Sequence, residues 1–274
     1  MQIGIMSRTF SRPSLEEELD AVADHGLNCM QLDLSSAGLP SLPNHIDEAD
    51  CDRIRKAMSA RKISMAGVNG MYNMIHPDAK QRERGLKKLG VLAPACERLG
   101  TSVIVLCTGS RNTQMMWLPH PDNDTPEAWD DLTASMEQAL QIAEEHKITL
   151  AFEPEVSNVV DSAKKSRRIL DEMRSPYLKV AMDGANIFHS GELPRMTEIL
   201  DEAFELLGED IVIAHAKDLD HDGAAGHLAA GKGLLDYDRY LSLLGNLGID
   251  VPLILHGLGE SEVDECIAFL RGKM

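Results

Sequence analysis

Apolar residues of this chain recur in short runs that alternate with longer stretches of helical spacing. The runs are rich in Val, Ile and Leu, which is the pattern expected of parallel strands that crossover helices bury on both faces. They cover residues 2–6, 28–34, 63–68, 102–107, 148–153, 178–183, 211–215 and 251–256. The pattern therefore predicts eight buried strands.

Each run is followed by a stretch that suits an amphipathic helix. In the first stretch Leu15, Leu19 and Val22 share one face, and Ser14 with Glu17 forms a capping box. A later stretch repeats the spacing in Leu132, Met136, Leu140 and Ala143. Eight strand–helix units without a linker or a composition break favour a closed (β/α)₈ TIM barrel over an open sheet. We interpret residues 1–274 as one α/β barrel domain.

Composition and charge narrow the class of protein and its partners. The chain has 274 residues, of which 43% are hydrophobic and 26% charged, as in a globular protein. Its net charge of -17 repels nucleic-acid phosphates and anionic membranes, so neither is expected as a partner. Five scattered cysteines without a C-x-x-C pair suggest no disulfide framework and no thiolate zinc site. With no export signal or apolar span in the sequence, we expect a cytoplasmic protein.

Four predicted strands in succession end on a side chain that can bind a metal ion. These residues are Glu153, Asp183, His215 and His256. TIM barrels carry their sites at the carboxyl ends of the strands, so we expect the four side chains to meet above the barrel. Oxygen and nitrogen ligands suit one divalent ion, Mn²⁺, Zn²⁺, Mg²⁺ or Fe²⁺. Any one polar strand end can equally face water, but four in succession favour a site.

Further polar residues follow these strands and are candidates for substrate binding. Glu155 lies two residues after Glu153 and either lines the pocket or faces solvent. Asn186 and His189 follow Asp183, and one of them binds substrate while the other packs under the loop. Of these two, Asn186 is the preferred substrate-binding residue.

The seventh strand carries a lysine just beyond its histidine. Lys217 lies two residues after His215, on the same side of the strand, and either holds a substrate oxygen or anion or pairs with Asp218 or Asp220. The Gly-Lys-Gly sequence at residues 231–233 lacks the further glycine of a dinucleotide fingerprint, so no nicotinamide site is expected.

The earlier loops give weaker signals. Arg8, His76 and Arg111 either reach into the pocket or pack within their loops, and Trp117 and His120 are candidates for a lid. Packing in the core is the default interpretation for the methionines of these loops, Met71, Met74, Met115 and Met116. The amides of Gly257 and Gly259 suit a phosphate, whereas the neighbouring Glu260 opposes an anion, so phosphorylation of the substrate stays open.

Several motifs resemble those of the xylose isomerase-like superfamily of sugar phosphate isomerases and epimerases. They are the strand-end Glu of AFEPE, the Asp of MDGAN, the H-x-K-D of HAKD and the G-x-G-x-x-D of GKGLLD. The resemblance extends over the whole chain in strand order and is most specific in its second half. It implies a single TIM barrel with one divalent metal ion, in a homodimer or homotetramer. It also implies that Glu153, Asp183 and His215 bind the metal and that Lys217 and His227 contact the substrate.

The chain departs from that pattern at three positions. His256 stands where epimerases of this group end the eighth strand on a second metal-bound glutamate. Asn186 replaces a frequent histidine, and Asp33 a frequent glutamate. Imidazole still binds metal, and with an ordinary pKa of about 6.5 it can move a proton. Epimerisation by two opposed glutamates is therefore in doubt.

The favoured hypothesis is a metal-dependent isomerase or epimerase acting on a small sugar, sugar phosphate or related hydroxy-carbonyl compound. In it Glu153 removes the α-proton to form an enediolate, and His256 returns the proton or completes the metal shell. A lyase or dehydratase using the same enolate is a close variant.

Two alternatives belong to other classes. One is a metallohydrolase of the apurinic-endonuclease type, which uses histidine-rich clusters of several metal ions; the additional histidines His76, His120, His189 and His227 permit it. The other is a barrel that has lost catalysis and only binds a ligand, an idea motivated by His256.

Overall fold

Eight parallel strands close into a barrel in the computed structural model, which describes all residues 1–274. Each strand pairs with the next along the chain, and the last one pairs with both β7 and β1, which closes the ring. The barrel strands are β1 (Ile3–Met6), β2 (Cys29–Leu32), β3 (Ser64–Asn69), β4 (Val103–Cys107), β5 (Thr149–Glu153), β6 (Leu178–Asp183), β7 (Ile211–Asp218) and β9 (Leu253–Leu255). All eight predicted strands and the (β/α)₈ fold are confirmed.

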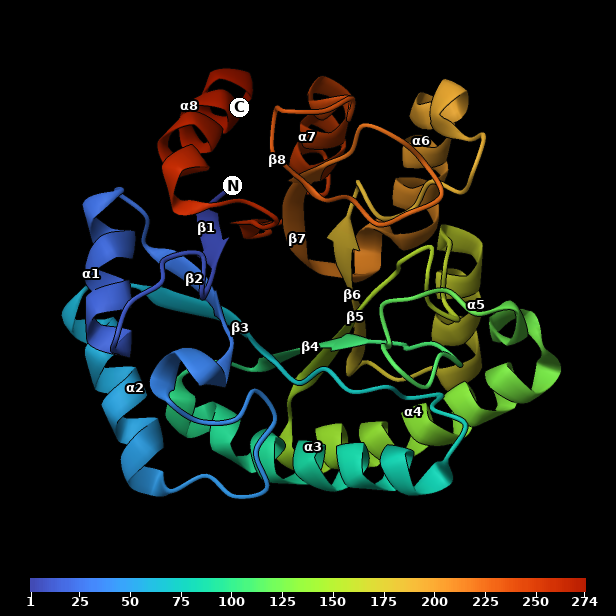
Figure 1. Ribbon diagram of the computed structural model, residues 1–274, viewed down its shortest axis with the longest axis horizontal. Coiled ribbons are helices and arrows are strands. Elements are labelled where there is room, and N and C mark those ends of the chain that lie inside the picture. Colours follow the sequence, from blue (N-terminus) through green and yellow to red (C-terminus); the bar gives the residue numbers. More distant parts are fainter.

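Helices surround the strands on all sides, as Figure 1 shows. They are α1 (Leu15–Asp24), α2 (Glu48–Ala60), α3 (Ala79–Leu99), α4 (Pro126–His146), α5 (Ala163–Met173), α6 (Met196–Leu207), α7 (Tyr237–Gly245) and α8 (Val263–Lys273). The hydroxyl oxygen of Ser14 accepts a hydrogen bond from the Glu17 amide, as expected of a helix N-cap. A short strand that the pattern did not predict, β8 (Leu228–Ala229), lies antiparallel against β7.

Two layers of apolar side chains fill the molecule. The larger, of 71 buried residues, includes inward-facing residues of the helices and the strand residues packed against them. A smaller cluster takes one residue from each of seven strands, namely Met6, Cys29, Val105, Ala151, Ala181, Ile213 and Ile254. Inside such a barrel alternate strands fill successive layers, so a cluster with one buried residue from each of seven strands forms an apolar plug in the barrel.

The plug decides where the polar strand ends lie. Side chains two residues apart on a strand face the same side, so the residue two positions after a plug residue also faces the barrel interior, nearer the carboxyl end. The plug residues and the polar residues that follow them are Ala151 and Glu153, Ala181 and Asp183, Ile213 and His215, and Ile254 and His256. The four candidate ligands therefore form a layer on top of the plug.

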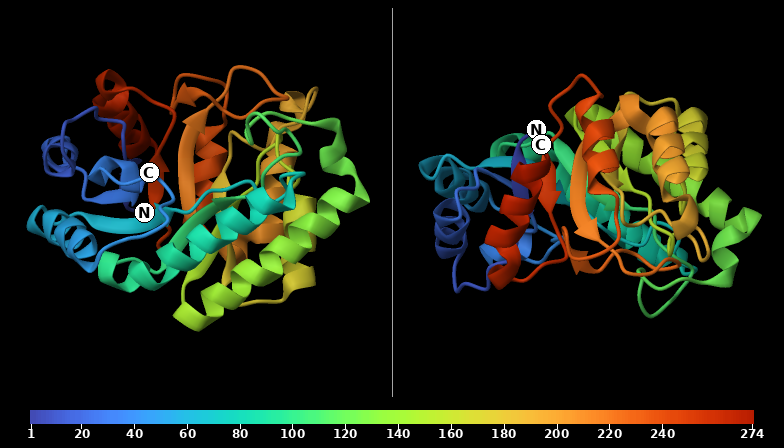
Figure 2. Two further views of the ribbon diagram at one scale, coloured as in Figure 1. Left: turned by 60° about the horizontal axis from the view of Figure 1, so that its bottom comes forward. Right: turned by 90° about the horizontal axis from the view of Figure 1, so that it is seen from above.

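The two ends of the chain lie side by side, as both views in Figure 2 show. The amino group of Met1 pairs with Asp250, at 3.1 Å, just before β9. All five cysteines are buried and free. None of the helices combines the length and the apolar character needed to cross a membrane.

Asp218, at the end of β7, forms hydrogen bonds with the segment 219–235 that follows the strand. Its carboxylate is buried and accepts hydrogen bonds from the amides of Leu219, Gly231 and Leu235, at 2.9, 3.0 and 2.9 Å. It therefore does not act as the ion-pair partner that the sequence offered for Lys217. Three amides around one carboxylate bind the β7–β8 region to the barrel.

We expect Asp218→Ala to lower the free energy of unfolding by about 3 kcal/mol or more, because it leaves three amides without a partner. Urea denaturation followed by circular dichroism measures the change. The matched control is Asp250→Ala, which removes a carboxylate that is 73% exposed and is expected to cost less than about 1 kcal/mol. Equal losses in the two variants would contradict this role of Asp218.

Candidate active site and metal centre

A cavity of about 670 Å³ opens above the plug, at the carboxyl ends of the strands. Its walls combine apolar groups with a few charged side chains, as in sites for small molecules. The lining residues are Met6, Ser7, Arg8, Asp33, Asn69, Met71, Trp117, Leu118, Pro119, Glu153, Glu155, Ser157, Lys217, Gly223, Ala224, Ala225 and His256. Loops after seven of the eight barrel strands contribute to it.

Three of the four predicted ligands meet beside this cavity. One ligand atom each from Asp183, His215 and His256 lies within 4.8 Å of the other two. The register places Asp183 opposite His215 on neighbouring strands, and the rings of His215 and His256 are 5.3 Å apart. His256 Nδ1 is buried without a hydrogen-bond partner, and buried Asp183 Oδ2 has only an ion pair, with Lys217. Because buried polar atoms are nearly always paired, this set fits a divalent cation.

Glu153 stands next to this triplet rather than in it. Its Oε1 lies 3.2 Å from His215 Nδ1 and accepts a hydrogen bond from Asn186 Nδ2, at 2.8 Å. Glu153 also lines the cavity. The other carboxylate oxygen, Oε2, has no hydrogen bond within the protein, so it is free to meet a bound molecule.

Gln31 orients His215, a role that the sequence interpretation missed. Gln31 Oε1 lies 2.9 Å from His215 Nε2, while Gln31 Nε2 donates to Asn69 Oδ1 at 2.8 Å. The amide oxygen of Gln31 thus accepts from Nε2, which fixes the ring and turns Nδ1 toward Glu153 and Asp183. The sequence signal that could have found it is a glutamine inside the apolar run of residues 28–34.

Lys217 neutralises part of the buried negative charge. Its Nζ lies 3.2 Å from Asp183 Oδ2, and it pairs with neither Asp218 nor Asp220. Burial lowers the pKa of Lys217, but the carboxylates of Asp183, Glu153 and Glu155 outweigh burial and raise the pKa above its ordinary value. The lysine also lines the cavity and can meet a substrate oxygen there.

The two carboxyl groups of the Glu-Pro-Glu segment differ in acidity. Burial raises the pKa of Glu153, but the charges of His215 and Lys217 and the hydrogen bond with His215 outweigh it and lower the pKa. Burial and the nearby charge of Glu153 raise the pKa of Glu155 to about 8. At neutral pH one group is therefore a carboxylate and its neighbour a neutral acid, a pairing suited to acid–base chemistry.

His256 is held in its neutral form. Burial and the charges of Lys217 and His215 lower the pKa of His256 to about 3. A neutral imidazole can bind a metal ion through a ring nitrogen but has no acidic proton of an imidazolium to give. This environment suits His256 better as a ligand than as a proton donor.

Asn186, His189 and His227 do not line the cavity. Asn186 is fully buried and positions Glu153, and its Oδ1 accepts from the amide of Gly226 at 3.0 Å. His189 lies 3.8 Å from Asp161, and His227 is 48% exposed on the loop after β7. Of these three predicted residues, only Asn186 contacts the site, by its hydrogen bond to Glu153.

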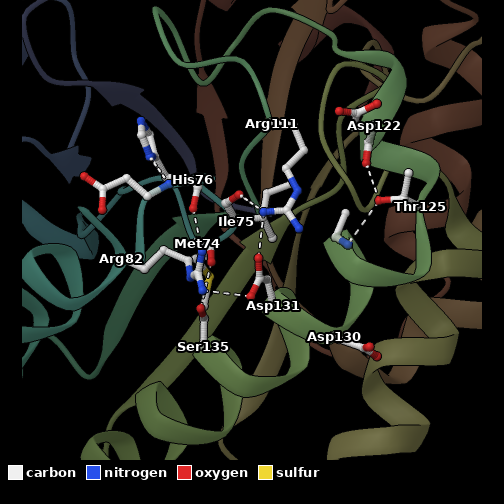
Figure 3. Close-up of polar contacts among 12 residues, drawn as sticks. Met74, Ile75, His76, Arg82, Arg111, Asp122, Thr125, Asp130, Asp131 and Ser135 are labelled. Carbon is white, nitrogen blue, oxygen red and sulfur yellow. Dashed lines mark hydrogen bonds and ion pairs between the residues drawn. The ribbon is translucent and has the colours of Figure 1, made fainter. Parts of the chain in front are cut away.

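Arg111 and His76 hold loops together, as Figure 3 shows. Arg111 Nη1 lies 2.6 Å from Asp131 Oδ2 and donates to the carbonyl of Ile75, while Arg82 binds the other oxygen of Asp131 at 2.8 Å. His76 accepts from the amide of Asp78 and does not line the cavity. Arg111, a candidate for the pocket from its sequence position, therefore pairs with the Asp131 carboxylate on α4.

Of the two residues predicted to form a lid, Trp117 and His120, one lines the cavity and the other does not. Trp117 lines the cavity together with Leu118 and Pro119, whereas His120 turns to its own loop and accepts from the amide of Asp122. Among the four methionines of these loops, Met71 alone lines the cavity. Met74 is buried in the core, and Met115 is 53% exposed.

The possible phosphate cradle before α8 is occupied by the protein itself. The amide of Gly259 donates to the Glu262 carboxylate at 2.8 Å, and Glu260 pairs with Arg12 at 2.6 Å. Two carboxylates at this turn leave it unsuited to a phosphate, because they repel an anion.

Glu155 predicts a pH dependence of stability. Its pKa is about 8 in the folded chain and ordinary in the unfolded one, so folded Glu155 keeps its proton where the unfolded chain releases it. Stability should therefore fall as the pH rises from about 5 to about 8. Urea denaturation with a chelator present should show a smaller fall for Glu155→Gln than for the wild type. Parallel pH profiles would contradict this environment of Glu155.

Comparison with known proteins agrees with the fold. The family model described as the xylose isomerase-like TIM barrel matches residues 19–272. No curated protein is similar to this chain in sequence.

Solved structures with this fold match over nearly the whole chain. A D-tagatose 3-epimerase-like protein has a TM-score of 0.79 at 14% identity, covering 100% of this chain and 97% of its own. The 3-keto-D-glucoside 4-epimerase YcjR from E. coli has a TM-score of 0.75 at 16% identity, with 99% of each chain covered. The IolI protein with a binding zinc atom has a TM-score of 0.74 at 17% identity, covering 99% of this chain and 96% of its own. At these identities the likeness shows the fold, and the family match shows that this chain belongs to the xylose isomerase-like TIM barrel family.

Proposed function

We propose that this protein is a divalent-metal-dependent isomerase or epimerase that acts on a small sugar or related hydroxy-carbonyl compound. The observation that carries the proposal is the meeting of Asp183, His215 and His256 beside the carboxylate of Glu153, with His256 Nδ1 buried and unpaired. The epimerases and the zinc-containing protein among the similar structures support this class of reaction.

Asp183, His215 and His256 would hold the metal ion, with Glu153 as the nearest further ligand. The mixed oxygen and nitrogen set suits Zn²⁺, Mn²⁺, Fe²⁺ or Mg²⁺. When bound, such an ion supplies Lewis-acid stabilisation of the negative charge that develops on a substrate carbonyl. Gln31 keeps Nδ1 of His215 directed at this position, where a bound ion would replace the proton that Nδ1 shares with Glu153.

Glu153 is the base that removes the proton next to the substrate carbonyl. Asn186 and His215 hold one of its oxygens, so the other is presented in a fixed direction. The lowered pKa keeps the group ionised at neutral pH, which is the form that a base needs. Fixing the base in this way removes the need to order it during the reaction.

The site favours transfer of a proton between adjacent carbons by one base. Epimerisation at one carbon needs a second base on the opposite face, and the residue at that position, His256, is neutral and belongs to the ligand set. Isomerisation of an aldose and a ketose needs only one base at carbon: Glu153 would take a proton from one carbon and return it to its neighbour, while the hydroxyl proton passes between the two substrate oxygens. One-base isomerisation is therefore the reaction that the residues support best.

Arg8 suggests that the substrate carries a negative charge. It lines the cavity, and its guanidinium has no carboxylate or carbonyl partner in a chain with 44 acidic residues. Its φ of 71° is unusual for a residue other than glycine, and its amide donates to the buried carboxylate of Glu18. Unfavourable backbone conformations that are held in place by neighbouring groups are typical of binding sites.

The metallohydrolase alternative finds less support. His76, His120, His189 and His227 do not join the triplet at the barrel mouth, so the residues for a cluster of several ions are missing there. The net charge of -17 also disfavours a nucleic-acid substrate. A lyase or dehydratase would use the same base and is separated by its product, because elimination releases water or another leaving group. Homodimer or homotetramer assembly and a cytoplasmic location stay predictions.

Deuterium exchange tests the role of Glu153. In D₂O, a panel of ketoses and sugar acids screened by NMR should include one whose α-proton exchanges with wild-type protein and a divalent metal. Glu153→Gln should slow this exchange by about 10²- to 10⁴-fold, and a chelator or Asp183→Asn should abolish it. The control Glu145→Gln, on the exposed face of α4, should keep the wild-type rate. Exchange at the wild-type rate in Glu153→Gln would end this mechanism.

Arg8→Gly separates the backbone conformation from the charge. Glycine adopts a positive φ without strain, so stability should stay equal or rise by up to about 1 kcal/mol. Loss of the guanidinium should raise the KM for an anionic substrate by at least about tenfold, with a smaller change for a neutral analogue. Lys62→Gly is the matched control, because Lys62 also has a positive φ, of 57°, but lies at the end of α2 away from the cavity. An unchanged KM in Arg8→Gly would show that Arg8 does not bind the substrate.

A further inference from the structure

The loop between β7 and β8 carries a second group of metal-binding side chains, outside the site described above. One ligand atom each from Asp220, His221 and His227 lies within 4.8 Å of the other two. Asp220 Oδ1 contacts His221 Nδ1 and lies 3.5 Å from His227 Nε2, and the two imidazole rings are 5.2 Å apart. All three side chains are exposed, so an ion can reach them from solvent.

We propose that Asp220, His221 and His227 form a second site, for one transition-metal ion of the Zn²⁺ class, which clips the β7–β8 loop at the rim of the cavity. Two imidazoles and one carboxylate are a ligand set that suits Zn²⁺, Co²⁺, Ni²⁺ or Cu²⁺. Three protein ligands leave the fourth position of a tetrahedral ion to water. The proposal uses no residue of the triplet at the barrel mouth and does not depend on the proposed reaction.

The second histidine distinguishes this group from ordinary surface pairs of histidine and aspartate. His45 is similarly exposed and lies 2.8 Å from Asp47, with no other imidazole in the group. At the β7–β8 loop, by contrast, two imidazoles approach the same carboxylate from two positions six residues apart. A single ion that binds all three groups accounts for this arrangement.

The three ligands lie at both ends of the β7–β8 loop, so a bound ion would join the two ends. Asp220 and His221 stand at the start of the loop and His227 at its end, so binding would close the intervening residues 222–226 into a short ring. Closing a loop in this way removes conformational freedom from the open form and transfers binding energy to the folded form. Gly223 suits the tight turn, since its φ is +80° and an added Cβ would lie 2.3 Å from Ser190 Oγ.

The clipped segment is part of the cavity and, through Gly226, contacts Asn186, the partner of the proposed base. Gly223, Ala224 and Ala225 line the cavity. The amide of Gly226 donates to Asn186 Oδ1, and Asn186 in turn donates to Glu153 Oε1. An ion on the loop would therefore steady both the rim of the cavity and the partner of Glu153.

Metal counting tests the proposal. Purified protein is dialysed to equilibrium against Zn²⁺, and bound zinc per chain is measured by atomic emission, with Co²⁺ absorption as a second probe. We expect two ions per chain in the wild type, one in His221→Ala and one in His227→Ala. The matched control His45→Ala should keep two, and Asp183→Asn should lose the ion of the barrel mouth and keep that of the loop.

Hydrogen exchange gives an independent readout. Zn²⁺ added to Asp183→Asn should slow amide exchange in residues 220–227, and it should not do so when His227→Ala is combined with it. The proposal is overturned if His221→Ala and His227→Ala bind as many ions as the wild type, or if His45→Ala loses an ion as they do. A single ion lost in Asp183→Asn and kept in His227→Ala would overturn this site while supporting the proposed function; the reverse pattern would do the opposite.

Discussion

The packing of apolar residues inside the closed barrel is the constraint on which the site depends. Four strands place an apolar side chain in the plug and a polar one two residues later. The plug fills the barrel below, so the polar side chains lie at its mouth. On β5 and β6 the plug residues are Ala151 and Ala181, directly below Glu153 and Asp183. Closure of the ring through β9 then brings His256 within reach of His215.

Burial sets the charge state of everything in that layer. Removing carboxylates from water is costly, and each carboxylate here is balanced by a neighbouring cation or donor. Lys217 and His215 balance Glu153 and Asp183, yet Asp183 Oδ2 and His256 Nδ1 stay without a hydrogen bond. The same desolvation keeps Glu155 protonated and His256 neutral. A site with ionised, protonated and neutral groups side by side is prepared for a cation and for proton transfer.

The loops are fixed by carboxylates that have no part in the chemistry. Asp218 gathers three amides after β7, and Asp131 binds Arg82 and Arg111 at the start of α4. These contacts place the cavity walls while leaving Arg8 without a partner at its edge. The loop after β7 connects the rim to Glu153 through Asn186, so this loop and the base share one hydrogen-bonded network.

The sequence by itself determined the barrel, the eight strands and the strand ends that carry the site, because the period of apolar positions and the polar residue ending each run are local properties of the chain. Asp183, His215 and His256 followed from that rule alone, and Gln31 would have followed from asking why an amide stands in a buried strand. The tertiary structure alone decided which loop residues reach the cavity. Arg111 and Asn186 are chemically as suited to bind a substrate as Arg8. In the fold, however, Arg111 pairs with Asp131 and Asn186 donates to Glu153, both from other parts of the chain. Partner choice among polar groups depends on distances of a few ångströms between loops, which no local pattern encodes.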